Sequence, residues 1–73
     1  MEKSELDILC ENIRKLRQVS GLSVPELAKV SGVSEYMLAQ LDKGNIPPRF
    51  GVEQLFSLCV FFRVPPHEIF KVL

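Results

Sequence analysis

Glycine, proline and serine recur along this chain where helices are expected to begin and end, and they divide it into short pieces. Glycine or proline stands at Gly21, Pro25, Gly32, Gly44, Pro47, Pro48, Gly51, Pro65 and Pro66. Between these residues, apolar side chains recur every three or four positions, as on one face of an α-helix. No stretch alternates apolar and polar residues for long, as a half-buried strand would. The sequence therefore predicts an all-α fold built from short helices.

The spacing predicts five helices in a compact bundle. Their expected starts follow Ser4, Ser23 and Ser34 or lie near Val52 and at Pro66, and their expected ends are Gly21, Gly32, Gly44, Pro65 and the last residues. Serine suits a helix start because its hydroxyl accepts a hydrogen bond from a free amide of the first turn. Ser23 and Glu26 have the spacing of a capping box. On the first helix, we expect Leu6, Leu9 and Ile13 to face the core.

The size and composition of the chain exclude several classes of protein. Its 73 residues, 47% hydrophobic and 25% charged, suffice for one small folded domain over residues 1–73 and are too apolar for a disordered chain. No apolar run reaches the roughly 18–20 residues that cross a bilayer. The acidic N-terminus does not resemble a secretory signal. We therefore expect a cytoplasmic protein without a membrane anchor.

The residues that most often carry chemistry are few. Cys10, Cys59 and His67 do not suffice for a disulfide scaffold or a zinc site. Both cysteines are expected to be small buried apolar residues, and the histidine is expected to be solvated. The spacing contains no nucleophile–base pair, glycine-rich phosphate loop or metal cluster. We therefore expect no metal, no cofactor and no enzymatic activity.

The charged residues are segregated along the chain, although the net charge is zero. Residues 1–11 carry four acidic side chains and one basic side chain, whereas residues 12–49 carry six basic and three acidic. A neutral total gives no general attraction to nucleic acid. The middle of the chain is nevertheless mildly positive.

Five residues have the spacing of a helix-turn-helix motif over about residues 24–43. They are Ala28, Gly32, Val33, Leu38 and Leu41. A small residue at position 28 lets two helices cross closely, and Gly32 can take the left-handed conformation that the turn needs. Val33 fills the angle between the helices, and the two leucines hold the second helix against the core. One such residue has no predictive value, but five in register indicate the motif.

With these residues, the chain resembles the phage-repressor and Cro-like helix-turn-helix family, also called the xenobiotic-response-element type. The resemblance runs from about Glu11 to Phe70. It rests on Ile13-Arg14-Lys15-Leu16-Arg17, Leu22-Ser23, Glu26-Leu27-Ala28, Ser31-Gly32-Val33-Ser34, Leu41-Asp42-Lys43-Gly44, Pro48, Leu55, Leu58, Phe62, Val64-Pro65 and Glu68-Ile69-Phe70. It implies a five-helix, lambda-repressor-like DNA-binding domain. Members of this family are mostly transcriptional regulators that bind operator DNA as dimers, so the resemblance implies a homodimeric repressor on a palindromic site of double-stranded DNA.

The resemblance assigns roles to residues of the motif and of the loop that follows it. It makes residues 35–42 the recognition helix, with base-reading positions at Glu35, Tyr36 and Gln40. It places phosphate contacts at Val24, Ser34, Lys43, Asn45 and Arg49. It joins Arg17 and Asp42 in a structural ion pair. The chemistry agrees in part, since glutamine can contact adenine with two hydrogen bonds and lysine or arginine can neutralise phosphates.

Two residues of the motif differ from those that favour DNA recognition in this family. Val24 stands where relatives often carry glutamine, and Glu35 puts a negative charge where many carry glutamine, arginine or lysine. Exposure on an ordinary helix face is the alternative interpretation of Tyr36 and Gln40. A second hypothesis is therefore a degenerate helix-turn-helix module of the antitoxin or scaffold type, which binds a protein and binds DNA weakly or not at all.

The fourth expected helix carries more apolar residues than one buried face can hold. Its largest apolar side chains include Phe56, Val60, Phe61 and Phe62. A surplus of apolar surface indicates a partner surface, unless the first helix covers it. The expected dimer surface comprises Val60, Phe61, Phe70 and Leu73. The partner is then a second copy of the chain or another protein bound to this helix.

Overall fold

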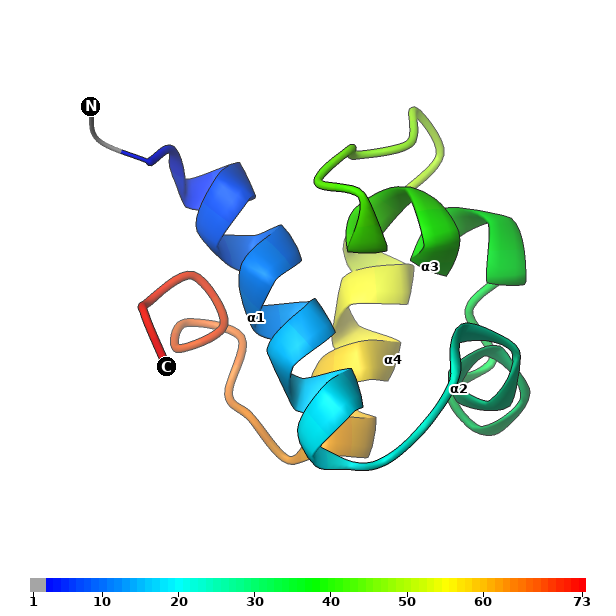
Figure 1. The fold of residues 1–73 in the computed structure, drawn as a ribbon. Helices are drawn as coiled ribbons and strands as arrows, with labels where there is room; N and C mark the ends of the chain where they lie inside the picture. The colour runs from blue at the N-terminus through cyan, green and yellow to red at the C-terminus, as the bar shows by residue number, and fades with distance from the viewer. Residues whose placement is uncertain (1–2) are drawn as a thin grey trace.

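The computed structural model describes residues 3–73, and this part of the chain consists of helices and turns without strands. The helices are α1 (Glu5–Val19), α2 (Val24–Ser31), α3 (Glu35–Asp42) and α4 (Val52–Phe62). Figure 1 shows α1 running diagonally across the molecule, with α2 and α3 on one side and the C-terminal segment, residues 65–73, on the other. The all-α prediction is confirmed, and the expected bounds of these four helices agree with the structure to within a few residues.

Serine residues begin the first three helices, as predicted. The Oγ atoms of Ser4, Ser23 and Ser34 accept hydrogen bonds from the backbone N–H three residues later, at 3.1, 3.2 and 3.1 Å. Glu26 completes a capping box on α2, because its carboxylate accepts from the Ser23 N–H at 2.9 Å. The hydrogen bond with the Ser23 backbone, and then that with its side chain, lowers the pKa of the Glu26 carboxyl by stabilising the charged form.

The prediction of a fifth helix from Pro66 is wrong, because residues 66–70 form turns instead. Pro65 and Pro66 have no N–H to donate, and hydrogen bonds here span only three residues, such as that from the Glu68 N–H to the Pro65 carbonyl at 2.9 Å. So short a segment forms too few hydrogen bonds to offset the cost of nucleating an α-helix. Burial fixes the segment instead, since Ile69 is 0% exposed. The predicted five-helix bundle is therefore a four-helix fold with a turn-rich C-terminal segment.

The core is apolar and draws on all four helices, the turn between α2 and α3, and the C-terminal segment. It comprises Leu9, Cys10, Ile13, Leu27, Val33, Leu38, Leu41, Leu58, Cys59 and Ile69. Both cysteines are buried as predicted, and burial raises the pKa of each thiol. The expectation that Leu6 faces the core is wrong, because this residue lies in the first turn of α1 and is 52% exposed.

A buried asparagine holds the C-terminal segment against α1. Asn12 is 3% exposed, and its Nδ2 donates to the carbonyls of Ile69 at 2.7 Å and Lys71 at 2.6 Å. The Nζ of Lys15 donates to the Leu73 carbonyl at 2.7 Å. These carbonyls lie outside any helix, so side-chain donors take the place of the backbone partners that a helix would supply.

Candidate nucleic-acid interface

The helices α2 and α3 and the turn between them form a helix-turn-helix. Gly32 ends α2 with φ at 80°, in the left-handed region, and its N–H donates to the Ala28 carbonyl at 3.0 Å. Val33 is 3% exposed and joins the core between the two helices. Leu38 and Leu41 are buried on the inner face of α3. Gly32, Val33, Leu38 and Leu41 therefore take the places that the spacing of the motif predicts, and Ala28 is half-buried against the core.

An arginine on α1 links that helix to the end of α3. Arg17 places Nη2 and Nε at 2.9 and 3.1 Å from Oδ1 of Asp42, and its Nη1 donates to the Leu22 carbonyl at 2.9 Å. The two charged side chains are 17% and 31% exposed, so the ion pair is partly shielded from solvent. Nη1 of Arg14 makes a longer contact, 3.4 Å, with the Asp42 carbonyl. The C-terminus of α3 is thus positioned by two arginines of α1.

The outer face of α3 is open to solvent from its first residue. Glu35 is exposed, Tyr36 is 66% exposed and Gln40 is half-buried one turn later. The backbone N–H of Asn45 donates to the Gln40 carbonyl at 2.9 Å, and the two side chains make a long contact of 3.4 Å from Nδ2 to Oε1. Gln40 and Asn45 therefore lie together, whereas Glu35 and Tyr36 lie at the N-terminal end of α3.

The basic residues assigned to phosphate contacts lie at opposite ends of α3. Arg49 shares a hollow of about 420 Å³ with Ser34, so it stands beside the N-terminus of α3. Lys43 shares another hollow, of about 410 Å³, with Asp7 and Glu11 of α1. Lys3 and Arg14 line the same hollow, and Lys3 pairs with Glu11 at 2.8 Å, so the charges around Lys43 are of both signs. This neighbourhood was not predicted, because the resemblance joins the end of α3 to Arg17 and assigns no role to the start of α1.

The N-terminus of α2 combines one favourable and one unfavourable feature for binding a phosphate. The side chain of Val24 packs against the core, and its backbone lies in the first turn, where the helix dipole favours an anion. The carboxylate of Glu26 occupies the same turn, bonded to the Ser23 N–H, and its lowered pKa keeps it charged. The Glu26 carboxylate therefore already provides a negative charge in the first turn of α2, where a phosphate would bind.

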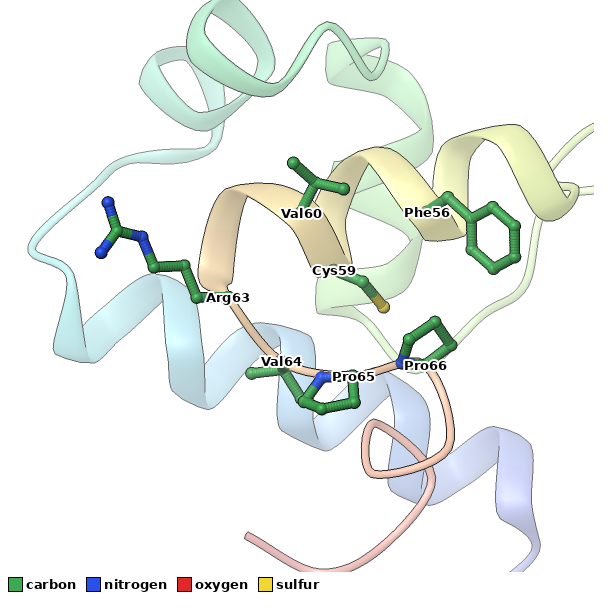
Figure 2. Close-up of a pocket in the computed structure, with 7 residues that line it drawn as sticks. All are labelled: Phe56, Cys59, Val60, Arg63, Val64, Pro65 and Pro66. Atoms are coloured by element: carbon green, nitrogen blue, oxygen red, sulfur yellow. The ribbon is translucent and has the colours of Figure 1, made fainter.

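The two α4 residues of the expected dimer surface lie together in an exposed apolar area. Val60 is 77% exposed and Phe61 is 37% exposed, and both line a hollow with Phe56 and with Val30 of α2. Figure 2 shows a second hollow on the other side of Val60, between Phe56, Arg63 and the start of the C-terminal segment. The first helix does not cover this side of α4.

The two C-terminal residues of the expected dimer surface lie elsewhere. Phe70 is half-buried and lines a hollow with Leu9 of α1 and with Phe50. Leu73 is 43% exposed, and its carbonyl is bonded to Lys15. The structure therefore does not bring these two residues into the hollows of α4.

No helix within residues 3–73 is long and apolar enough to cross a membrane. In the same range, no group of three histidine, cysteine, aspartate or glutamate side chains is placed to hold a metal ion. Cys10 and Cys59 are free thiols.

Comparison with known proteins shows a similarity to a transcriptional regulator. The chain is 32% identical over 63 residues to the HTH-type transcriptional regulator DdrOP3 of Deinococcus deserti. The match covers 86% of this chain and 47% of that protein, so the chain spans about half the length of this relative. No protein-family model matches the sequence, and no solved structure matches it. The similarity supports the helix-turn-helix assignment of α2 and α3.

Proposed function

We propose that this chain is a sequence-specific DNA-binding transcriptional regulator that reads DNA with α3. The exposed outer face of α3 carries the proposal, because this is the face that a helix-turn-helix protein presents to DNA. The Arg17–Asp42 ion pair fixes the C-terminal end of α3. An α-helix fits the major groove of B-DNA, where each base pair offers a distinct set of donors, acceptors and methyl groups. The similarity to an HTH-type transcriptional regulator supports the same function.

Three side chains of α3 meet base edges in this proposal. Gln40 contacts adenine through both atoms of its amide, which requires only that its long contact with Asn45 be exchanged for the base. The ring of Tyr36, largely exposed, packs against a thymine methyl group. Glu35 accepts from the amino group of a cytosine, which is the base partner that a carboxylate can have.

The phosphate contacts flank these base contacts. Ser34 and Arg49 serve one end of α3, and Lys43 and Asn45 serve the other, so the two sets hold the backbone on both sides of the groove. The backbone of Val24 contributes at the N-terminus of α2. These contacts fix the orientation of α3 and carry no sequence information themselves.

The regulator acts as a homodimer in this proposal. Two copies present two α3 helices about 34 Å apart on a roughly palindromic operator, one helical turn of B-DNA. The exposed apolar face of α4, with Val60 and Phe61, supplies the surface on which the copies meet. Occupancy of the operator is enough to repress transcription, because it blocks access to the promoter.

Two substitutions separate base contacts from phosphate contacts. On a duplex selected from a random pool, Gln40→Ala should relax the preference at one base pair by about 1–3 kcal/mol. Lys43→Ala should weaken binding to all duplexes alike and reduce the salt dependence. Lys71→Ala, which removes an exposed lysine of the C-terminal segment, is the matched control and should change neither. Equal effects of the two lysine substitutions would contradict the proposed orientation of α3.

A protein-interaction module is the second candidate function. The exposed apolar face of α4 favours it, as do the carboxylates of Glu26 and Glu35 on the side where DNA would bind. In this case the chain should retain a partner protein on α4 and retain no duplex even at low salt. Substitutions on α3 should then leave the interaction unchanged, whereas Val60→Lys should abolish it.

A further inference from the structure

One exposed stripe along α4 has an acidic residue at one end, a basic residue at the other and apolar residues between them, so it can pair with the same stripe of a second copy. The stripe comprises Glu53, Phe56, Val60 and Arg63, at intervals of three, four and three residues. Glu53, Phe56 and Val60 share one side of α4 at these intervals. Arg63 follows α4 as its C-cap and lines a hollow with Phe56 and Val60. All four are exposed, with Phe56 at 48% and Val60 at 77%. An acidic residue therefore stands at one end, a basic residue stands at the other, and two apolar residues lie between them.

The stripe is symmetric about position 58 of the helix. Positions 53 and 63 lie at equal distances from this point, and so do positions 56 and 60. When two copies of α4 lie antiparallel about a two-fold axis at this point, Glu53 faces Arg63 of the partner subunit and Phe56 faces Val60 of the partner subunit. We propose that two copies of this chain associate through antiparallel α4 helices in this register, with an ion pair at each end. Such an interface uses the same patch of both copies, as two-fold symmetry requires.

The two charged ends of the stripe are available for these contacts. Among residues 3–73, the ion pairs join other side chains, namely Lys3 with Glu11 of α1 and Arg17 of α1 with Asp42 of α3. Arg63 follows α4 with φ at 58°, a left-handed conformation that favours glycine. An arginine at this position therefore carries a backbone cost, which a contact of its guanidinium can offset.

The surface on either side of Val60 is shaped to receive a side chain. One hollow, of about 420 Å³, lies between Phe56 and Arg63 and is bounded by Pro65 and Pro66, as Figure 2 shows. The other, of about 440 Å³, lies toward α2 and is lined by the same Phe56 and Val60. When helices pack, the ridge of side chains on one enters the groove of the other. The Phe56 ring of each copy faces Val60 of the partner subunit and enters a hollow beside it.

This inference deepens the homodimer of the proposed function and rests on that part of it. The hollows of α4 share no residue with the hollow that Ser34 and Arg49 line beside α3. The surface proposed for the partner subunit and the surface proposed for the duplex therefore use different residues.

Charge reversal and its rescue in trans test this register. Sedimentation equilibrium of the full chain without DNA measures the dimer dissociation constant. Either Glu53→Lys or Arg63→Glu alone puts like charges together at both ends, and each should raise the dissociation constant by about tenfold or more. An equimolar mixture of the two variants restores opposite charges at both ends, so it should form heterodimers with nearly the original affinity. Glu5→Lys, which reverses a charge in the first turn of α1, is the matched control and should have no effect.

Three results would overturn the inference. If the wild-type chain stays monomeric at the highest soluble concentration, the proposed dimer does not form. If the mixture of the two variants does not restore the affinity, the proposed pairing of Glu53 with Arg63 of the partner subunit is wrong. If either charge reversal prevents folding, Glu53→Gln and Arg63→Gln remove the attraction without adding repulsion and should weaken the dimer several-fold. An unchanged dissociation constant in both would again contradict the register. These measurements contain no DNA, so their failure is distinct from a failure of the chain to bind a duplex.

Discussion

Arg17 joins three parts of the chain through one guanidinium, which contacts the carboxylate at the end of α3 and the carbonyl of Leu22 before α2. Arg17→Ala leaves both acceptors without this donor. We expect it to lower the free energy of unfolding by about 1–3 kcal/mol, measured by urea denaturation. Arg17→Lys keeps the charge but lacks the planar fork that reaches both partners, so an intermediate loss is expected.

A double-mutant cycle with Asp42→Asn isolates the ion pair from the other contacts of Arg17. The two losses should not add, because the residues share one contact. If Arg17→Ala costs as much free energy of unfolding in the Asp42→Asn background as in the wild type, the ion pair does not contribute to stability.

Contacts of single side chains with distant segments were the features that the sequence predicted least well. Asn12 occupies a helix-interior position, and no periodicity shows that its amide is buried against two carbonyls of a distant segment. The placement of Asp7 and Glu11 beside Lys43 is equally long-range. Leu6 was predicted to be buried but is exposed. Periodicity gives the face of a helix that turns inward, but not the point along the helix where the core ends.

At the scale of elements, the capping box of α2 makes stability depend on pH. The Ser23 hydrogen bonds lower the pKa of the Glu26 carboxyl below its ordinary value of 4.5. A carboxyl with a lower pKa in the folded state stabilises the fold fully above its unfolded-state pKa, and that contribution is lost as the pH falls through the folded-state pKa. Glu26→Gln should therefore have a lower Tm than the wild type at neutral pH, and the difference should shrink in acid as the pH falls through the lowered pKa of Glu26. An equal difference at both pH values would contradict this origin.

The turn of the motif depends on one glycine. A Cβ built on Gly32 meets no atom within 4 Å, so any cost of substitution comes from its φ of 80° and not from crowding. Gly32→Ala should destabilise the fold by roughly 1–2 kcal/mol. Gly32→Asn should cost less although its side chain is larger, because asparagine tolerates the left-handed region. Chemical denaturation measures both, and a larger cost for asparagine would indicate crowding instead.

Helix starts and the turn were predictable because their causes are local. Serine caps and the glycine at position 32 act within a few residues, and the structure shows each where it was expected. The segment after Pro65 was not predictable in the same way. Two prolines and a short apolar run suggest a helix start, but the conformation is set by burial of Ile69 and by Asn12 on α1. Tertiary contacts therefore override the local signal there.

At the scale of the whole molecule, one copy presents one α3. The principal extents of the molecule are 34, 24 and 21 Å, and with one α3 a single copy would not place helices in two successive major grooves about 34 Å apart. Recognition of a palindrome therefore requires the second copy that α4 is proposed to hold. The sequence pointed to a surplus of apolar surface on this helix, but only the structure shows that its exposed stripe ends in an acid and a base.

The neutral net charge makes the salt dependence of binding a direct measure of the proposed phosphate contacts, because they and not the overall charge must supply the attraction. In the proposed dimer, Lys43 and Arg49 of two copies would neutralise about four phosphates, so we expect a slope of about −3 to −4 in a plot of log affinity against log salt. Replacing both residues by alanine should remove most of this slope.

Fluorescence anisotropy of a labelled mixed-sequence duplex, titrated with the chain from about 50 to 200 mM salt, tests DNA binding through α3 most directly. We expect binding at the low-salt end that weakens by roughly 100-fold across this range, as about four released counterions require. No binding at the low-salt end, or binding that salt does not weaken, would contradict a phosphate-tracking surface around α3.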